Sequence, residues 1–259
     1  MTLLDEICGA ALDLARAGRW ERALTLLDVA DSDDPRFALA AAEIAVDHDM
    51  RTGGNEAATR LATAERLCGP AWDVQFLRLR IDYFGQLFAD GRFSFGPDGK
   101  DPAVLDALHQ RAGKLAADAP DSVREGWAHM YHGLILDNLF ADRAAAPAHY
   151  AIALRAGEGG GDVPLTWEAL RHLGDHDRDE GHLDSARERW QRATALAAAS
   201  GATPATLAQQ MLLAVLARDT GDEAGAVALA REISRWSAAI GAVRQHQQAE
   251  AFLANEIVA

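Results

Sequence analysis

The amino-acid sequence predicts an all-α protein built from antiparallel helix pairs, and three observations indicate this. Alanine-rich segments carry apolar residues at three- and four-residue spacing, which is the period of one helical face. Similar segments recur along the 259 residues, separated by glycine or proline. Only 7% of the residues are aromatic, which suits closely packed helices better than a β-sandwich. A chain of this length can fold as one array when its units repeat.

Charge and composition exclude several classes of partner. The net charge is −14 and the chain has no run of Lys and Arg, so we expect no binding to nucleic acid or to anionic membranes. No segment reaches the ~18 uninterrupted apolar residues of a membrane span. Asp5 and Glu6 lie where a signal peptide needs positive charge. Because Cys8 and Cys68 lack CxxC spacing, we expect buried thiols in a reducing compartment, the cytoplasm.

Residues 4–37 contain the first predicted helix pair. Gly18 supplies the turn between its helices, and the small residues Ala11 and Ala23 lie where the two helices must approach closely. Pro35 begins the following helix, where its missing N–H leaves no hydrogen bond unmade. The spacing therefore predicts two helices that each bury one apolar stripe.

The next part of the chain contains a second pair and then a break. Residues 39–72 repeat the pattern and are followed by an aromatic-rich helix over residues 71–89. Residues 91–102 carry glycine, proline and an Asp-Gly pair, which predict a surface loop. Phe93 and Phe95 in this loop either pack back onto the preceding helix or form an exposed hook for a partner.

We expect this loop to separate two arrays that form one continuous solenoid, residues 1–90 and residues 103–259. The second array begins with a helix over residues 103–118, and residues 121–157 form its first pair. The glycine-rich link at residues 158–162 predicts a hinge.

Two further pairs and a last helix complete the second array. Residues 167–200 turn at Gly181, and residues 207–240 turn at Gly221. The last helix, residues 242–257, is polar on one side. This is expected of a terminal cap that has no outer neighbour to bury against.

These spacings resemble the tetratricopeptide repeat (TPR), a helix pair of about 34 residues. The first pair matches six characteristic positions of the repeat: one small residue, one glycine, two alanines, one large apolar residue and one proline. The matching residues are Ala11, Gly18, Ala23, Leu27, Ala30 and Pro35. The resemblance covers roughly three quarters of the chain. It implies a right-handed superhelix, a solenoid of antiparallel helix pairs that binds a peptide or a protein along its concave face.

The resemblance also implies which residues face a partner, because fixed positions on the first helix of each TPR unit line the concave face. The candidate partner-binding residues are Glu43, Asp47, Arg171, Asp175, Arg178, Asp179, Met211, Val215 and Arg218. The arginines could bind an acidic group while neighbouring aspartates orient them. The alternative is that these charges pair with one another on the helix surface.

A run of histidines and aspartates in residues 167–200 suggests metal binding as an alternative. His172 and His176 lie one helical turn apart, and the turn at Gly181 could bring a third histidine near. The alternative ligands are His172, His176, Asp179 and His182. Asp177 stands where a TPR has a large apolar residue, so it needs solvent or a partner. A second histidine-rich region, which we interpret as ordinary packing, contains His129, His132 and His149.

We therefore expect a non-enzymatic scaffold that needs no cofactor and binds a peptide, a partner protein or a second copy of itself. The sequence contains no GxSxG, CxxC or P-loop motif. Two alternatives stay open. One is a small-ligand sensor, since comparable arrays occur in bacterial regulators, and a pocket closed near Tyr83 and Phe95 would favour it. The other is a metal-dependent enzyme centred on His172, His176 and Asp179.

Overall fold

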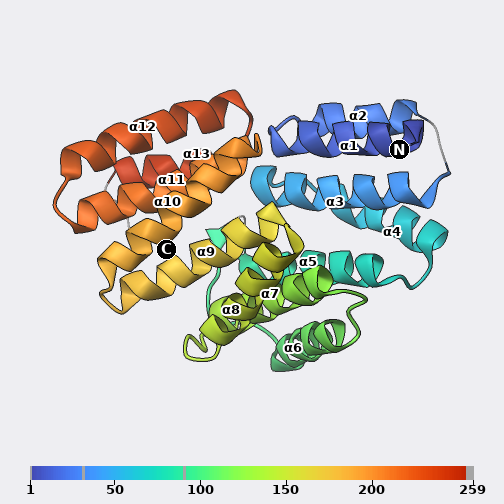
Figure 1. Cartoon of the computed structure of the whole chain (residues 1–259), viewed down its shortest axis with the longest axis horizontal. Coiled ribbons are helices and arrows are strands. Elements are labelled where there is room, and N and C mark those ends of the chain that lie inside the picture. The colour runs from blue at the N-terminus through green and yellow to red at the C-terminus, as the bar shows by residue number, and fades with distance from the viewer. Residues whose placement is uncertain (1, 31–32, 90–91, 255–259) are drawn as a thin grey trace. The chain divides into compact units, whose positions relative to one another are not determined.

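The computed structural model of the chain describes residues 2–30, 33–89 and 92–254, and these residues form thirteen helices (Figure 1). Contacts divide the chain into two compact units. Unit 1 combines Met1–Gly69 with Thr194–Ala259, and unit 2 comprises Pro70–Ala193. These boundaries differ from those of the predicted arrays, residues 1–90 and 103–259, because the units follow contacts in space and the arrays follow the chain.

Unit 1 is built from helices at both ends of the sequence. Its N-terminal helices are α1 (Leu3–Arg16), α2 (Trp20–Val29), α3 (Pro35–Thr52) and α4 (Ala57–Cys68). Its C-terminal helices are α11 (Thr203–Asp219), α12 (Glu223–Ala239) and α13 (Val243–Leu253). Local chemistry sets several of these ends: Thr2 forms a capping box with Asp5, and Asp34 caps α3 directly before Pro35.

The N-terminal and C-terminal helices of unit 1 pack against each other, since α1 contacts α11 and α3 contacts α13. Ala242 lies in the same core cluster as Trp20 and Phe37. Arg244 donates a hydrogen bond of 2.6 Å to the carbonyl of Met50, near the end of α3. The last helix therefore has a further neighbour, and the prediction of an uncovered terminal cap is wrong. Its predicted end at Ile257 lies outside the described residues.

Unit 2 contains the elements that position the candidate site. Its helices are α5 (Trp72–Leu87), α6 (Pro102–Ala117), α7 (Ser122–Asn138), α8 (Ala146–Gly160), α9 (Val163–Asp179) and the first part of α10 (Leu183–Ala199). Consecutive helices α6, α7, α8 and α9 pack on one another, and α5, α7 and α9 also touch. The first helices of successive pairs therefore form one surface of unit 2, which we call the inner face.

The predicted surface loop is ordered over its described residues, while Gly91, its first residue, lies outside them. A two-residue antiparallel ladder joins β1 (Phe88–Ala89) to β2 (Arg92–Phe93) and places Phe88 opposite Phe93. The Phe93 ring lies 4.7 Å from that of Phe88 and 5.5 Å from that of Phe95. Phe93 and Phe95 remain 43% and 45% exposed. The phenylalanines thus stack on one another and stay accessible to solvent.

The turns of the C-terminal half form where the sequence predicts them. Gly181 and Gly221 adopt φ values of 82° and 88°, which glycine reaches without steric cost. α9, α11 and α13 begin every 40 residues, at Val163, Thr203 and Val243. This repeat is longer than the TPR unit of about 34 residues, and its paired helices are correspondingly long.

The predicted hinge at residues 158–162 is wrong, because α8 continues through Gly160 and Asp162 caps α9. Gly160, and Gly157 just before the predicted hinge, serve close packing instead. A Cβ on Gly157 would lie 2.7 Å from Thr166 Oγ1, and a Cβ on Gly160 would lie 2.2 Å from Val123 Cγ2. Glycine at these positions lets α8 approach its neighbours within van der Waals contact.

The described residues confirm the all-α class and the helix-pair organisation. Among the helices in the described ranges, none combines the length and the hydrophobicity that crossing a bilayer requires. The core of unit 2 around α5 and α7 is aromatic, with Tyr83 and Tyr131 in edge-to-face contact at 5.6 Å. Such pairs contribute about 0.5–1.5 kcal/mol beyond their buried area.

Candidate functional site: a polar cluster on α7, α8 and α9

A polar cluster lies where α9 meets α7 and α8, and sequence reasoning identified its α9 members. α9 buries Leu165, Ala169 and Leu170 in the core, so the polar residues of its second half are brought against the neighbouring helices. We call the resulting group the α7–α9 cluster. It comprises Asp137, Arg143, Tyr150, Arg171, His172, Asp175, His176 and Asp179.

Asp137 is the centre of the cluster. Its buried side chain accepts hydrogen bonds from Arg143 at 2.8 Å, from the Tyr150 hydroxyl at 3.1 Å and from His176 Nε2 at 3.2 Å. Burial alone would raise the pKa of this carboxyl, but the hydrogen bond from His176 and the charge of Arg143 lower the pKa below its ordinary value. Asp137 therefore stays ionised at neutral pH and holds three side chains from different segments.

His172 and Asp175 lie next to this centre and respond to burial in opposite directions. Burial lowers the pKa of His172 to about 3, and the charge of Arg171 contributes. Burial raises the pKa of Asp175 to about 7. Both shifts disfavour the charged form, so His172 is neutral and Asp175 titrates near neutral pH. The Asp175 side chain is 28% exposed, so its proton can exchange with solvent.

Arg171 is the cluster residue with an unmet hydrogen bond. Its Nε atom is buried and has no hydrogen-bond acceptor among the described residues. A buried donor left unpaired costs about 1–3 kcal/mol, more when the group is charged. The guanidinium lies close enough to Asp175 and His172 for its charge to influence the pKa of each.

Several predicted partner-binding residues have partners within the protein. Asp179 pairs with Arg143, and Asp47 on α3 accepts hydrogen bonds from Trp20 Nε1 at 3.1 Å and from Arg51 at 3.2 Å. Arg178 also interacts within the chain, and Glu43 has an exposed side chain with its own contacts. These contacts within the chain are of the kind that the alternative of pairing on the helix surface describes.

On α11, the predicted partner-binding residues contact other parts of the protein. Met211 is only 2% exposed and lies in one core cluster with Phe252 of α13, where Val215 also packs. The Arg218 guanidinium lies 3.5 Å from the centre of the Phe252 ring, donates to the Phe252 carbonyl and pairs with Glu223. The last helix thus covers this surface, which the sequence pattern of α11 alone did not reveal.

The alternative metal ligands are not brought together. His176 Nε2 contacts Asp137, Asp179 pairs with Arg143, and His182 is 63% exposed beside Glu180. Within the described ranges, the histidines that place donor atoms close together are His129, His132 and His149. Asp177 finds the partner that it needs, because Arg189 donates to it at 2.6 Å. The metal-dependent enzyme centred on α9 therefore has no assembled ligand set in the described residues.

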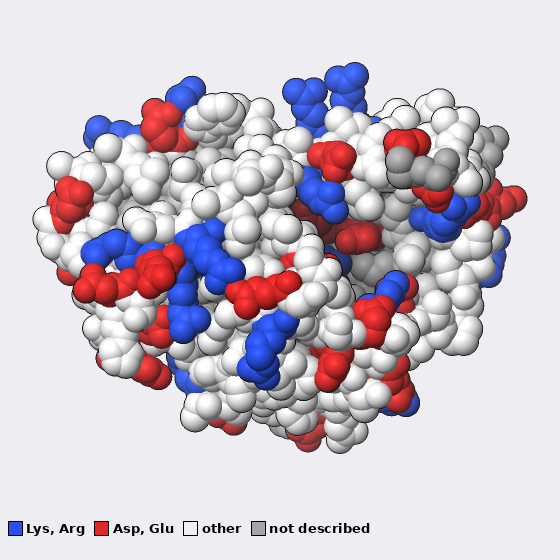
Figure 2. Space-filling model, viewed as in Figure 1, with Lys and Arg blue, Asp and Glu red and all other residues white. Residues whose placement is uncertain are grey.

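The small-ligand alternative finds no support near Tyr83, which lies in the core while Phe95 is exposed. An open hollow of about 490 Å³ lies instead between α5 and α6, and the ion pair of Arg111 with Asp82 lines it. On the face drawn in Figure 2, basic and acidic side chains are interspersed and form no extended basic patch.

No family model and no curated protein sequence matches the chain. Among solved structures, the chain is similar to the crystal structure of a Rap protein complexed with competence and sporulation factor. The TM-score is 0.64 at 12% sequence identity, and the alignment covers 96% of this chain and 69% of that one. Because that protein has a TPR-like helical repeat fold, the similarity supports a TPR-like solenoid of helix pairs for this chain.

Proposed function

We propose that the protein is a non-enzymatic scaffold that binds a peptide or a protein segment on the inner face of unit 2. The contact centre is the α7–α9 cluster, and Arg171 is the residue that binds the ligand. The ligand supplies a carbonyl or carboxylate oxygen, because these are the acceptors that a guanidinium donor prefers in proteins.

The observation that carries this proposal is the buried Nε of Arg171, which lacks an acceptor among the described residues. Its neighbours fit the same ligand. Asp175, with its pKa raised to about 7, is partly protonated at neutral pH and can then donate a hydrogen bond to a carbonyl. Neutral His172 adds no charge that would compete with Arg171 for an acidic group.

The fold supports the proposal independently of the cluster. A Rap protein of similar fold has been solved in complex with competence and sporulation factor. First helices that touch in sequence order, as α5, α7 and α9 do, present their side chains on one continuous face. We therefore expect an extended segment to contact α7 and α9 together.

A peptide display library tests the proposal. Peptides enriched on the immobilised wild-type protein are measured by fluorescence polarisation against three proteins: wild type, Arg171→Met and Arg187→Met. Arg187 is the control, since it lies on α10 and pairs with Asp184. Methionine keeps the apolar stem of either arginine and removes the donors. We expect binding to Arg171→Met to be weaker by at least about tenfold, and binding to the control to be unchanged.

Two outcomes would contradict the proposal. One is a library that yields no peptide with saturable binding to the wild type. The other is an enriched peptide that binds Arg171→Met as tightly as it binds the wild type. Thermal melting of each variant establishes that it is folded before its affinity is interpreted.

A further inference from the structure

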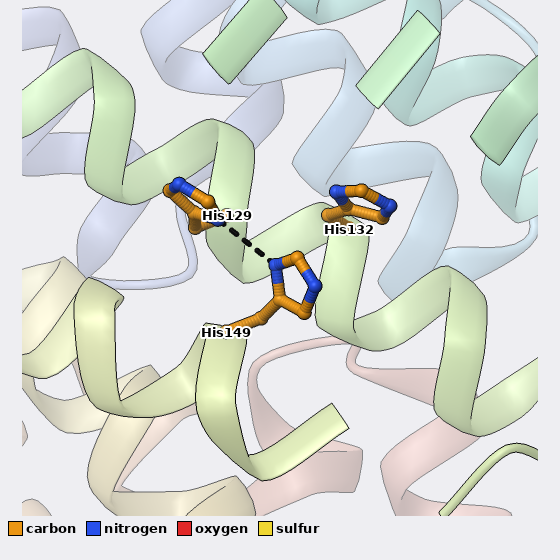
Figure 3. Close-up of side chains that lie close together, drawn as sticks. All are labelled: His129, His132 and His149. Atoms are coloured by element: carbon orange, nitrogen blue, oxygen red, sulfur yellow. Dashed lines mark hydrogen bonds between the residues drawn. The ribbon is translucent and has the colours of Figure 1, made fainter. Parts of the chain in front are cut away.

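Four histidines that are not members of the α7–α9 cluster gather on helices α6, α7 and α8 of unit 2. His129 and His132 are three residues apart on α7 and so share one face of that helix. His149 on α8 faces both of them, with its ring centre 5.1 Å from that of His129 and 4.2 Å from that of His132 (Figure 3). His109 on α6 contacts His132 from the other side, at 4.5 Å between ring centres.

The nitrogen atoms of this group are spaced as metal ligands would be. His129 Nδ1 and His149 Nδ1 lie 2.9 Å apart, and one donor atom each from His129, His132 and His149 lies within 4.8 Å of the others. Imidazole nitrogens bind Zn²⁺ at about 2.0–2.1 Å, so tetrahedral ligands lie roughly 3.3 Å from one another. Small rotations of the three side chains would bring their lone pairs onto one ion.

His132 has a nitrogen without a hydrogen-bond partner in the part of the chain that the structure describes. Its Nε2 lies 3.0 Å from His109 Nδ1, whereas its Nδ1 is inaccessible to solvent and has no hydrogen-bond partner among the described residues. When Nε2–H donates to His109, the Nδ1 atom carries a free lone pair. Ligand histidines in metal sites commonly donate their other N–H to an outer partner in this way. His109 would then be a positioning residue for His132.

The electrostatics of the group also suit a cation. Burial lowers the pKa of His129 and of His149, and burial together with the neighbouring histidines lowers the pKa of His132 to about 4. All three rings are therefore neutral at physiological pH, the form in which imidazole binds metals. The chain has a net charge of −14, which favours the approach of a cation over that of an anion.

We propose that His129, His132 and His149 form a binding site for one divalent transition-metal ion of the zinc class, with His109 positioning His132. Each ligand ring gives one nitrogen lone pair. Where Nδ1 of His129 and of His149 bind the ion, the hydrogen bond between them is replaced and each neutral ring carries its proton on Nε2. Three neutral imidazoles suit Zn²⁺, Co²⁺, Ni²⁺ and Cu²⁺, and they leave a fourth position for water.

Titration of the full-length protein with Zn²⁺, after removal of bound metal by a chelator, tests the site by calorimetry. We expect one equivalent to bind the wild type. Removal of one ligand in His132→Ala or His149→Ala is expected to weaken binding by at least about tenfold. The matched control is His182→Ala, because His182 is exposed and distant in sequence from the group. It is expected to bind like the wild type.

Three further measurements separate a metal site from a structural role of the histidines. Bound Co²⁺ is expected to give the visible absorption bands of a four-coordinate ion with three imidazole nitrogens and one water as ligands. His109→Gln, which keeps a hydrogen-bonding group, is expected to retain more affinity for Zn²⁺ than His109→Ala. In the unmodified wild type, Zn²⁺ is expected to protect His129, His132 and His149, but not His182, from diethyl pyrocarbonate, so this result does not depend on any variant folding.

The proposal is overturned if the wild type binds no stoichiometric Zn²⁺. It is also overturned if His149→Ala and His182→Ala bind the ion equally well, or if Zn²⁺ leaves the modification of His129, His132 and His149 unchanged.

Discussion

Replacement of Gly126 by alanine is expected to lower the free energy of unfolding by roughly 2 kcal/mol. Gly126 lies on α7 where that helix crosses α8 and α9. An added Cβ would lie 2.5 Å from the Cβ of Ala156 and 2.8 Å from a methyl carbon of Leu165. The Cβ of Ala156 is fixed by the backbone and cannot rotate away, so the helices themselves must separate. The loss of packing outweighs the gain of about 1 kcal/mol in helix propensity.

The same replacement at Gly85 is the matched control. Gly85 lies on α5, and an added Cβ there would have no atom within 4 Å. Without a clash, only the helix propensity changes, so we expect Gly85→Ala to raise the free energy of unfolding by about 0.5–1 kcal/mol. Urea denaturation of the two variants checks the difference in sign. Equal effects at the two positions would contradict the close approach of α7 to α8.

Asp175→Asn is expected to stabilise the protein, and increasingly so as the pH rises. The pKa of Asp175 is raised from 3.8 to about 7 in the folded protein. Its carboxyl therefore contributes stability that is fully present below about pH 4 and is lost as the pH rises through about 7. A shift of this size corresponds to about 4 kcal/mol, at about 1.4 kcal/mol per pKa unit. Because the side chain is 28% exposed, solvent screening reduces this energy. We therefore expect Asp175→Asn to raise the free energy of unfolding by roughly 2 kcal/mol above about pH 7.

The measurement is the difference in unfolding free energy between Asp175→Asn and the wild type, from about pH 4.5 to about pH 8.5. The pKa of His172 is lowered to about 3, so the stability that this neutral ring contributes is lost as the pH falls. His172 is present in both proteins, so its contribution largely cancels in the difference. Asp184→Asn serves as the control, since the Asp184 side chain is 97% exposed. A difference for Asp175→Asn that stays flat with pH would show that this carboxyl is not held protonated.

The sequence predicted helix ends well wherever backbone chemistry decides them. Glycine turns at Gly181 and Gly221, and the proline start of α3 at Pro35, depend only on local φ and ψ preferences. The glycines of residues 158–162 misled the prediction for a physical reason. Glycine serves both flexible links and close helix contacts, and only the neighbouring helix decides which applies.

Among the residues of the α7–α9 cluster, those on α9 are the ones that the sequence singled out as candidate partner or metal ligands. Helical spacing placed Arg171, His172, Asp175 and His176 on α9 correctly, because residues three and four apart share a face. The partner of His176 is Asp137, which lies 39 residues earlier on α7. Contacts of this kind depend on how two helices are rotated against each other. The spacing of residues within one helix gives no information about that rotation. For the same reason the sequence did not predict that α13 covers Met211. Nor does spacing within one helix predict that the His149 ring contacts those of His129 and His132.

The central claim is that a bound segment lies on the inner face formed by α7 and α9. Amide hydrogen exchange of the wild-type protein, with and without a display-selected peptide, tests this claim most directly. We predict slower exchange in the peptide complex at residues 122–138 and 163–179, with the largest change near Arg171. Slower exchange confined to unit 1, or to α6 and α8 alone, would contradict the account.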